Sequence, residues 1–159
     1  MPCYLFTWHT YGSWMPDRPR GYVRRDVDGV LPKDDDAAKA YRERMRGDAV
    51  LLSGSEQKQV VAVLRSSAEP LSLRFHAVGV DPTHVHALVS WTDGRGWEAI
   101  RRSLRSSLTR GLNERVGKRV WFGRGGSRKR VVQPQHFDRL MRAYLPGHHA
   151  VFWREGDTE

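Results

Sequence analysis

At residues 83–90 the sequence reads Thr-His-Val-His-Ala-Leu-Val-Ser. This short apolar run predicts a β-strand, and residues i and i+2 of a strand leave the same face, so His84 and His86 should point at one place. Neutral imidazole is the commonest protein ligand for divalent metals, and two imidazoles leave positions open for a third ligand and a substrate oxygen. The pair therefore predicts half of a metal site. The alternative is two partly exposed side chains on one face of an antiparallel strand.

The segments around this strand predict its place in a sheet. Residues 73–80 alternate well enough to form the preceding strand, and Asp81-Pro82-Thr83 is a tight connection between the two. The remaining pattern predicts strands at residues 4–10 and 119–132, and helices at 34–46, 55–67, 97–112 and 135–144. Without the first and last helices the order is βαββαβ. This is an α+β fold, a ferredoxin-like sandwich whose four-stranded antiparallel sheet carries helices on one face and the histidine strand in its middle.

The length of 159 residues predicts a single domain over residues 1–159. Residues 11–50 would be an inserted loop and short helix, and residues 134–149 an extra C-terminal helix and turn. Hydrophobic residues make up 39% and charged residues 28%, which is ordinary for a soluble globular protein. No apolar run approaches a membrane span and no signal-peptide pattern opens the chain, so a cytoplasmic, nucleoid-associated protein is expected, with no membrane partner. Cys3 is the only cysteine, which excludes an intramolecular disulfide and a cysteine metal cluster.

The basic charge is concentrated in one part of the chain. The net charge is +9, and residues 94–144 hold 14 Lys and Arg residues against 3 acidic ones, whereas the rest of the chain is slightly acidic. Such a segment indicates a polyanionic partner, most simply nucleic acid. Aromatic and arginine side chains are also mixed near the N-terminus, where they would either stack on unpaired bases or cover the core edge. The residues expected to bind DNA are Arg101, Arg102, Arg105, Arg110, Lys118, Arg124, Arg128, Lys129, Arg130, Trp14 and Arg20.

Four stretches together resemble the REP-associated tyrosine transposases, which are relatives of the IS200/IS605 transposases in the single-tyrosine HUH family. They are the run Thr7-Trp8-His9-Thr10-Tyr11-Gly12-Ser13-Trp14-Met15-Pro16 with Arg20-Gly21, the pair His84-Val85-His86, the segment 121–127 with its Arg-Gly-Gly-Ser, and the closing helix with Tyr144. The resemblance covers most of the chain. It implies a metal-dependent endonuclease and strand transferase that cleaves and rejoins single-stranded or hairpin DNA through a 5′-phosphotyrosine intermediate.

The resemblance also implies roles for particular residues. Tyr144 would be the nucleophile, and His84, His86 and a third ligand one turn after the tyrosine would hold Mg²⁺ or Mn²⁺. That third position is His148, with His149 beside it. Pro146-Gly147 lies between, and because proline tends to end a helix, His148 would reach the metal from a turn or not reach it. The role of His9 stays open, since strand 4–10 can neighbour the histidine strand, and His76 and His136 are expected to be structural or at the surface.

Two other functions compete with this interpretation. A domesticated, non-catalytic hairpin DNA-binding protein would keep the sheet and the basic surface without cutting DNA. A nucleotide-binding hydrolase of the His-x-His-x-His type would need a third histidine at position 88, which is Leu88. The sequence leaves open whether the protein is a monomer or a homodimer, because no apolar seam decides it.

Overall fold

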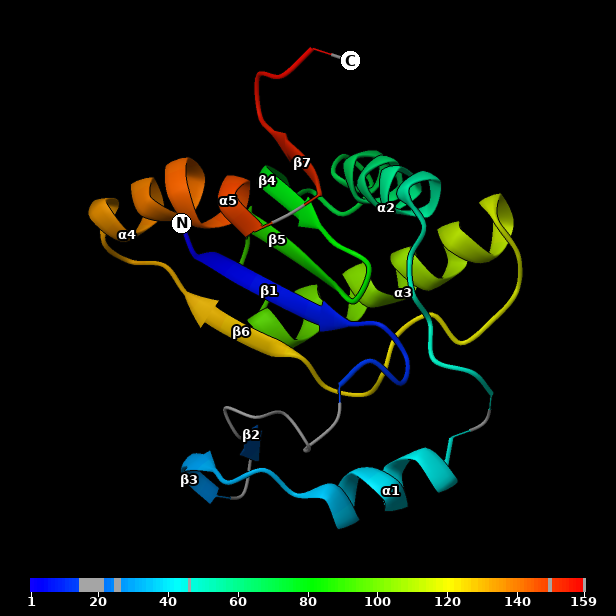
Figure 1. The fold of residues 1–159 in the computed structure, drawn as a ribbon. Coiled ribbons are helices and arrows are strands. Elements are labelled where there is room, and N and C mark those ends of the chain that lie inside the picture. The colour runs from blue at the N-terminus through cyan, green and yellow to red at the C-terminus, as the bar shows by residue number, and fades with distance from the viewer. Residues whose placement is uncertain (15–21, 25–26, 46, 149, 159) are drawn as a thin grey trace.

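The protein is built on one five-stranded antiparallel sheet (Figure 1). The structure, a computed structural model, describes residues 1–14, 22–24, 27–45, 47–148 and 150–158, so Arg20 and His149 lie outside the described residues, as does the side chain of His148. The strands lie in the order β6 (Ser127–Arg130), β1 (Cys3–His9), β5 (His84–Ser90), β4 (Arg74–Val80) and β7 (Val151–Arg154). The histidine strand β5 is central, as predicted.

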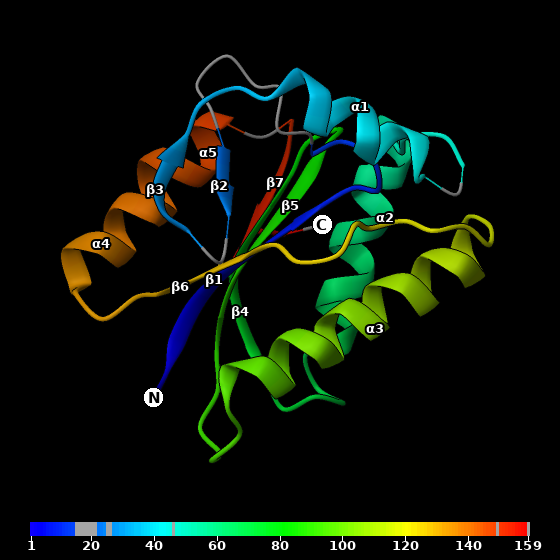
Figure 2. The same ribbon diagram turned by 90° about the horizontal axis from the view of Figure 1, so that it is seen from below.

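Helices cover both faces of this sheet (Figure 2). On one face lie α2 (Gly54–Ser67), which begins with a capping box between Ser53 and Glu56, and α3 (Trp97–Arg115). On the other face one continuous helical segment comprises α4 (Pro134–Arg139), the π-helix η1 (Leu140–Tyr144) and α5 (Leu145–His148). No helix among the described residues has both the length and the apolar character that crossing a membrane requires.

The order β1-α2-β4-β5-α3-β6 confirms the predicted ferredoxin-like βαββαβ sandwich, and three details differ. The sheet has a fifth strand, because β7 pairs with β4 along an edge that would otherwise be exposed. The predicted inserted loop within residues 11–50 contains two short paired strands, β2 (Tyr22–Arg24) and β3 (Val27–Leu31), before the helix α1 (Asp35–Glu43). The last predicted strand is shorter than residues 119–132. Phe122 forms only an isolated bridge with Thr10, Gly125 and Gly126 have φ angles of 84° and 115°, and continuous pairing with β1 begins at Ser127.

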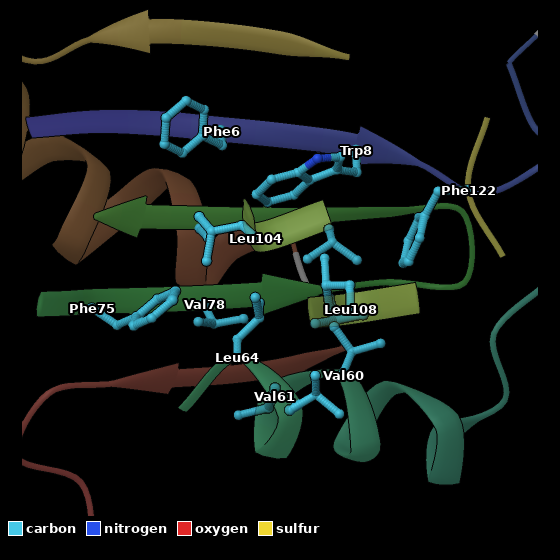
Figure 3. Close-up of a cluster of buried hydrophobic side chains, with 14 of the residues drawn as sticks. Phe6, Trp8, Val60, Val61, Leu64, Phe75, Val78, Leu104, Leu108 and Phe122 are labelled. Carbon is cyan, nitrogen blue, oxygen red and sulfur yellow. The ribbon is translucent and has the colours of Figure 1, made fainter. Parts of the chain in front are cut away.

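The main core lies between the sheet and the α2–α3 layer. Alternate strand side chains such as Phe6, Trp8 and Val78 point toward Leu64 of α2 and Leu104 of α3 (Figure 3). In α3, which the sequence predicts as a helix, Ile100, Leu104, Leu108 and Leu112 recur at helical spacing and are fully buried. The opposite strand positions form a smaller cluster that holds the C-terminal helical segment on the sheet, made of Leu5, Ala77, Leu88, Val131, Leu140 and Leu145. A helical layer thus packs on each face of the sheet.

A polar network joins β4 and β5 to Glu155, the residue that follows β7. His76 of β4 is buried, its Nε2 lies 2.8 Å from Ser90 Oγ, and its Nδ1 lies 3.8 Å from Glu155 Oε2. Arg74 donates to the same Glu155 carboxylate at 3.0 Å. Burial, and then the charge of Arg74, lower the pKa of His76, while Glu155 acts in the opposite direction. His76 therefore has a structural position, as expected.

Gly111 of α3 packs directly on Val63 of α2, and its replacement by alanine should destabilise the protein. A Cβ at Gly111 would lie 2.7 Å from both methyl carbons of Val63, a stiff side chain in a helix. Replacing glycine by alanine inside a helix normally stabilises the fold by about 1 kcal/mol. Overpacking against a neighbouring side chain destabilises it by about 1–3 kcal/mol, which here should outweigh that gain. Urea unfolding should show Gly111→Ala less stable than wild type, and Gly117→Ala, in open space, nearly unchanged. Equal stability of both variants would contradict this packing.

His76 should contribute to a loss of stability in mild acid. Because its pKa is lower in the folded protein than the unperturbed value of about 6.5, the unfolded chain takes up the proton first as the pH falls. The free energy of unfolding therefore decreases as the pH falls below about 6.5, because the unfolded chain binds a proton that His76 in the folded protein does not. His76→Gln keeps a polar side chain without this titration, so its unfolding free energy should fall less between pH 7.5 and 5.5 than that of wild type. An equal or larger fall in the variant would show that His76 does not carry this effect.

Candidate active site

The pairing register of three strands places polar side chains on one face of the sheet. His84 of β5 lies opposite His9 of β1, and His86 lies opposite Thr7. Thr7 in turn lies opposite Ser127 of β6. Because directly opposite residues of an antiparallel pair project to the same side, these side chains share one face. This is the face that η1 and α5 cover. Leu5 and Leu88 are the next opposite pair on the same face, and they pack in one cluster with residues of that helical segment.

The imidazoles lie as the strand pattern predicts. The ring centroids of His84 and His86 are 4.8 Å apart, with the rings nearly perpendicular. The ring of His9 lies 6.0 Å from that of His84, so the open question about His9 is answered in favour of the site. Three histidines from two neighbouring strands therefore lie in one row.

Tyr144 comes from the opposite layer and meets this row. Its ring centroid lies 5.8 Å from that of His86, and its side chain is 37% exposed. It ends the π-helix η1, in which the Leu145 N–H donates to Leu140 O. The prediction that Pro146-Gly147 ends the helix at this point is wrong, because α5 continues to His148. A proline cannot donate to the helix ladder, and the wider π-turn immediately before it changes which carbonyls need a donor.

A cavity of about 1010 Å³ separates the histidine row from α4 and η1. Among the described residues, Lys129, Arg130 and Arg139 line it and no acidic side chain does. Its remaining wall consists of Leu5, Thr7, His9, Thr83, His84, His86, Ser127, Val132, Gln133, Gln135, His136, Leu140 and Tyr144. An open cavity whose described lining holds three permanent cations and no carboxylate favours an anionic ligand such as a phosphodiester.

Polar contacts fix the two strand histidines. Asp81, in the turn before β5, places Oδ2 2.9 Å from His84 Nδ1. The hydroxyl oxygen of Thr7 lies 2.6 Å from His86 Nδ1. Such partners set the ring orientation of metal-binding histidines in general. Two oriented imidazoles suit Mg²⁺ or Mn²⁺ as a partial ligand set that leaves room for water and phosphate oxygen, although softer metals prefer imidazole more strongly.

No described side chain joins the two histidines as the predicted third metal ligand. Within residues whose side chains are placed, no group of three His, Cys, Asp or Glu residues is arranged to hold a metal. The side chain of His148, the predicted third ligand, lies outside that part of the chain. Burial raises the pKa of the Cys3 thiol to about 11, which keeps it protonated near neutral pH.

The predicted DNA-binding residues divide between two faces of the sheet. Lys129 and Arg130 line the tyrosine cavity. A second groove, of about 710 Å³, runs along α3 on the other side of the sheet. Its cationic side chains are Arg102, Arg105, Arg110 and Lys118, accompanied by Ser106, Thr109, Asn113 and Glu114. Burial and the nearby Arg124 lower the pKa of Arg105, so this groove also favours added negative charge.

Others of the predicted set make contacts within the protein. Arg101 donates to Gly125 O and so holds the loop before β6. Arg128 stacks over the ring of Trp97, 3.7 Å from its centroid, on the α3 side. Trp14 packs edge-on against Tyr41 of α1, with ring centroids 6.0 Å apart. These three side chains therefore stabilise packing within the protein, whether or not they also contact a ligand.

Several site residues escaped the sequence analysis. Thr7 and Asp81 are positioned by strand register and by a turn, and neither residue type stands out in a sequence. Arg139 and His136 of α4 also line the cavity, and the partly exposed His136 agrees with the expected surface position. The position of Thr7 could have been predicted from the sequence, because the alternation of side chains along β1 puts Leu5, Thr7 and His9 on one face.

Comparisons with known proteins identify the fold. No protein-family model matches the sequence, and no curated protein matches it at the level of sequence. Among solved structures, a REP-associated tyrosine transposase bound to a REP hairpin is similar, with a TM-score of 0.52 at 10% identity over 88% of this chain. The match spans 62% of that transposase, less than two thirds of its length. A candidate transposase from Deinococcus radiodurans R1 is similar with a TM-score of 0.51 at 15% identity, over 94% of this chain and 92% of that one. The chain therefore shares the fold of a REP-associated tyrosine transposase, the resemblance that its sequence motifs predicted.

Proposed function

We propose that this protein is a tyrosine transposase that cleaves and rejoins single-stranded DNA next to a hairpin. The observation that carries the proposal is the position of Tyr144, which stands 5.8 Å from the His86 ring at the mouth of a cationic cavity. A phenol, two oriented imidazoles and a phosphate-binding wall are the parts that phosphodiester transesterification needs. The likeness to a transposase bound to a REP hairpin supports hairpin DNA as the partner.

In the proposed reaction the Tyr144 hydroxyl oxygen forms a bond to the scissile phosphorus. The bond from phosphorus to the 3′-oxygen breaks, which leaves a 5′-phosphotyrosine and a 3′-hydroxyl. The phenolic proton leaves through the open cavity, and the departing 3′-oxygen takes up a proton. Because one phosphodiester replaces another, the bond energy is kept, and a 3′-hydroxyl can later reverse the step without ATP.

The side chains around Tyr144 would have separate tasks. His84 and His86 would hold Mg²⁺ or Mn²⁺, which supplies Lewis-acid polarisation of the phosphoryl oxygens when bound. Lys129 and Arg139 would hold the backbone phosphates on either side of the reacting one. The α3 groove, with its four cations, would take phosphates of the hairpin outside the tyrosine cavity.

A second candidate is a hairpin DNA-binding protein that does not cut. The observation that favours it is the two-histidine donor set, which no third described His, Cys, Asp or Glu side chain completes. Both candidates use the same basic surfaces. They differ in whether a covalent link forms at Tyr144.

An adduct assay separates these two functions. Purified protein is incubated with labelled, hairpin-bearing single strands and Mn²⁺, and protein–DNA adducts are resolved on a denaturing gel. Wild type and Tyr41→Phe, a control at another exposed tyrosine, should form the adduct, and Tyr144→Phe and His84→Ala/His86→Ala should not. An adduct that persists in Tyr144→Phe would refute the assignment of the nucleophile. Tight hairpin binding with no adduct in any variant would establish the non-catalytic binder.

Binding should also separate the two basic surfaces. Lys129→Ala/Arg139→Ala should weaken binding of short single strands and lower the slope of log K against log salt by about 0.7 for each lost phosphate contact. Arg102→Ala/Arg110→Ala should leave short single strands bound and weaken hairpins, in fluorescence anisotropy titrations at several salt concentrations. Equal effects of both pairs on both ligands, or a preference for blunt duplex, would contradict this division.

A further inference from the structure

The carboxylate of Asp81 serves two groups at once. Its Oδ1 accepts from Thr83 N at 2.7 Å, from His84 N at 2.9 Å and from the Thr83 hydroxyl at 3.1 Å. These contacts close the turn that leads into β5. Its other oxygen, Oδ2, lies 2.9 Å from Nδ1 of the His84 ring, which also has the Thr83 hydroxyl 3.1 Å away.

A carboxylate can only accept, and this decides where the proton of the His84 ring lies. An unprotonated Nδ1 would direct its lone pair at Oδ2 over 2.9 Å, which is repulsive, so Nδ1 carries hydrogen and donates to Asp81. The neutral ring then has its lone pair on Nε2. We infer that Asp81 is a positioning residue that presets His84 to bind a divalent cation through Nε2. This inference rests on the proposed function for its purpose, but not for its geometry.

The contact between His86 and Thr7 is of a different kind. Its Nδ1 lies 2.6 Å from the hydroxyl oxygen of Thr7, and a hydroxyl can donate or accept, so this contact permits either ring tautomer. The two histidines thus differ: a charged acceptor fixes the proton of His84, whereas Thr7 alone does not fix that of His86. His86 is therefore an internal reference for any measurement on Asp81.

The turn is also held by contacts that do not involve the Asp81 side chain. Thr83 O accepts from Thr10 N at 2.9 Å and from the Ser13 hydroxyl at 3.1 Å, and Pro82 O accepts from Leu52 N at 2.8 Å. These bonds anchor the turn to two segments distant in sequence. A change confined to the Asp81 carboxylate should therefore leave the backbone of the turn in place.

The experiment reads the imidazole protons in metal-free protein. In ¹⁵N-labelled full-length protein at pH 8, long-range ¹H–¹⁵N correlation should show His84 protonated on Nδ1. Asp81→Asn keeps an oxygen for the turn but directs an amide N–H₂ at His84 Nδ1, so the proton should move to Nε2 while His86 is unchanged. The affinity for Mn²⁺ alone, measured by titration calorimetry, should fall about 10–100-fold. Asp93→Asn, at another turn aspartate that accepts from the backbone N–H two residues on, is the matched control and should change neither reading.

Two results would overturn the inference. One is a wild-type His84 protonated on Nε2, a reading that needs no variant and so decides the matter even if Asp81→Asn fails to fold. The other is an Asp81→Asn protein with unchanged tautomer and Mn²⁺ affinity. Loss of the proposed function looks different, because a protein that forms no DNA adduct can still hold His84 in the Nδ1–H form.

Discussion

The antiparallel pairing of β1 with β5 is the constraint on which the site depends. Seven consecutive residue pairs join the two strands, from Cys3 with Ser90 to His9 with His84. A shift of one residue would turn every side chain of a strand to the other face and exchange the apolar core for the histidine row. The packing of Phe6 and Trp8 against α2 and α3 therefore fixes the register, and the register fixes where His9, His84 and Thr7 lie. Stability of the core and geometry of the site have one cause.

The tyrosine reaches the same place by a separate route. Leu140 begins the π-helix η1 and Leu145 follows it. Both leucines are buried in the cluster that holds Leu5 and Leu88 of the sheet, and Tyr144 lies between them in sequence. π-turns are frequent at functional sites because they rotate a side chain out of the regular helical row. Here the rotation keeps both leucines in the small core and leaves Tyr144 exposed beside His86. In a regular helix, burial of both leucines and exposure of Tyr144 beside His86 would compete with each other.

The sequence predicted the elements that local periodicity determines. It did not predict the features that depend on contacts with segments distant in sequence. The stripe of α3, the hairpin of β4 and β5, the βαββαβ order and the shared face of His84 and His86 all follow from periodicity. Strand β7 has only four residues, and it forms because Val151 and Trp153 pack on the main core while Phe152 packs on the smaller one. Such a strand depends on its neighbours more than on its own propensity. The role of Asp81 was equally hidden, since the turn is readable from the sequence but the ring beside its second oxygen is not.

Strand β6 has a further consequence for assembly. In the described part of the chain it forms one edge of the sheet, and its sequence Ser-Arg-Lys-Arg is exposed along its length. Arg128 lies on the α3 side and Lys129 on the cavity side, so both borders of this edge are positive. Charged side chains on an edge strand oppose its pairing with another strand, and two copies of this edge would bring six cations together. The same residues that suit a polyanion thus protect the sheet from extending into a second molecule through β6.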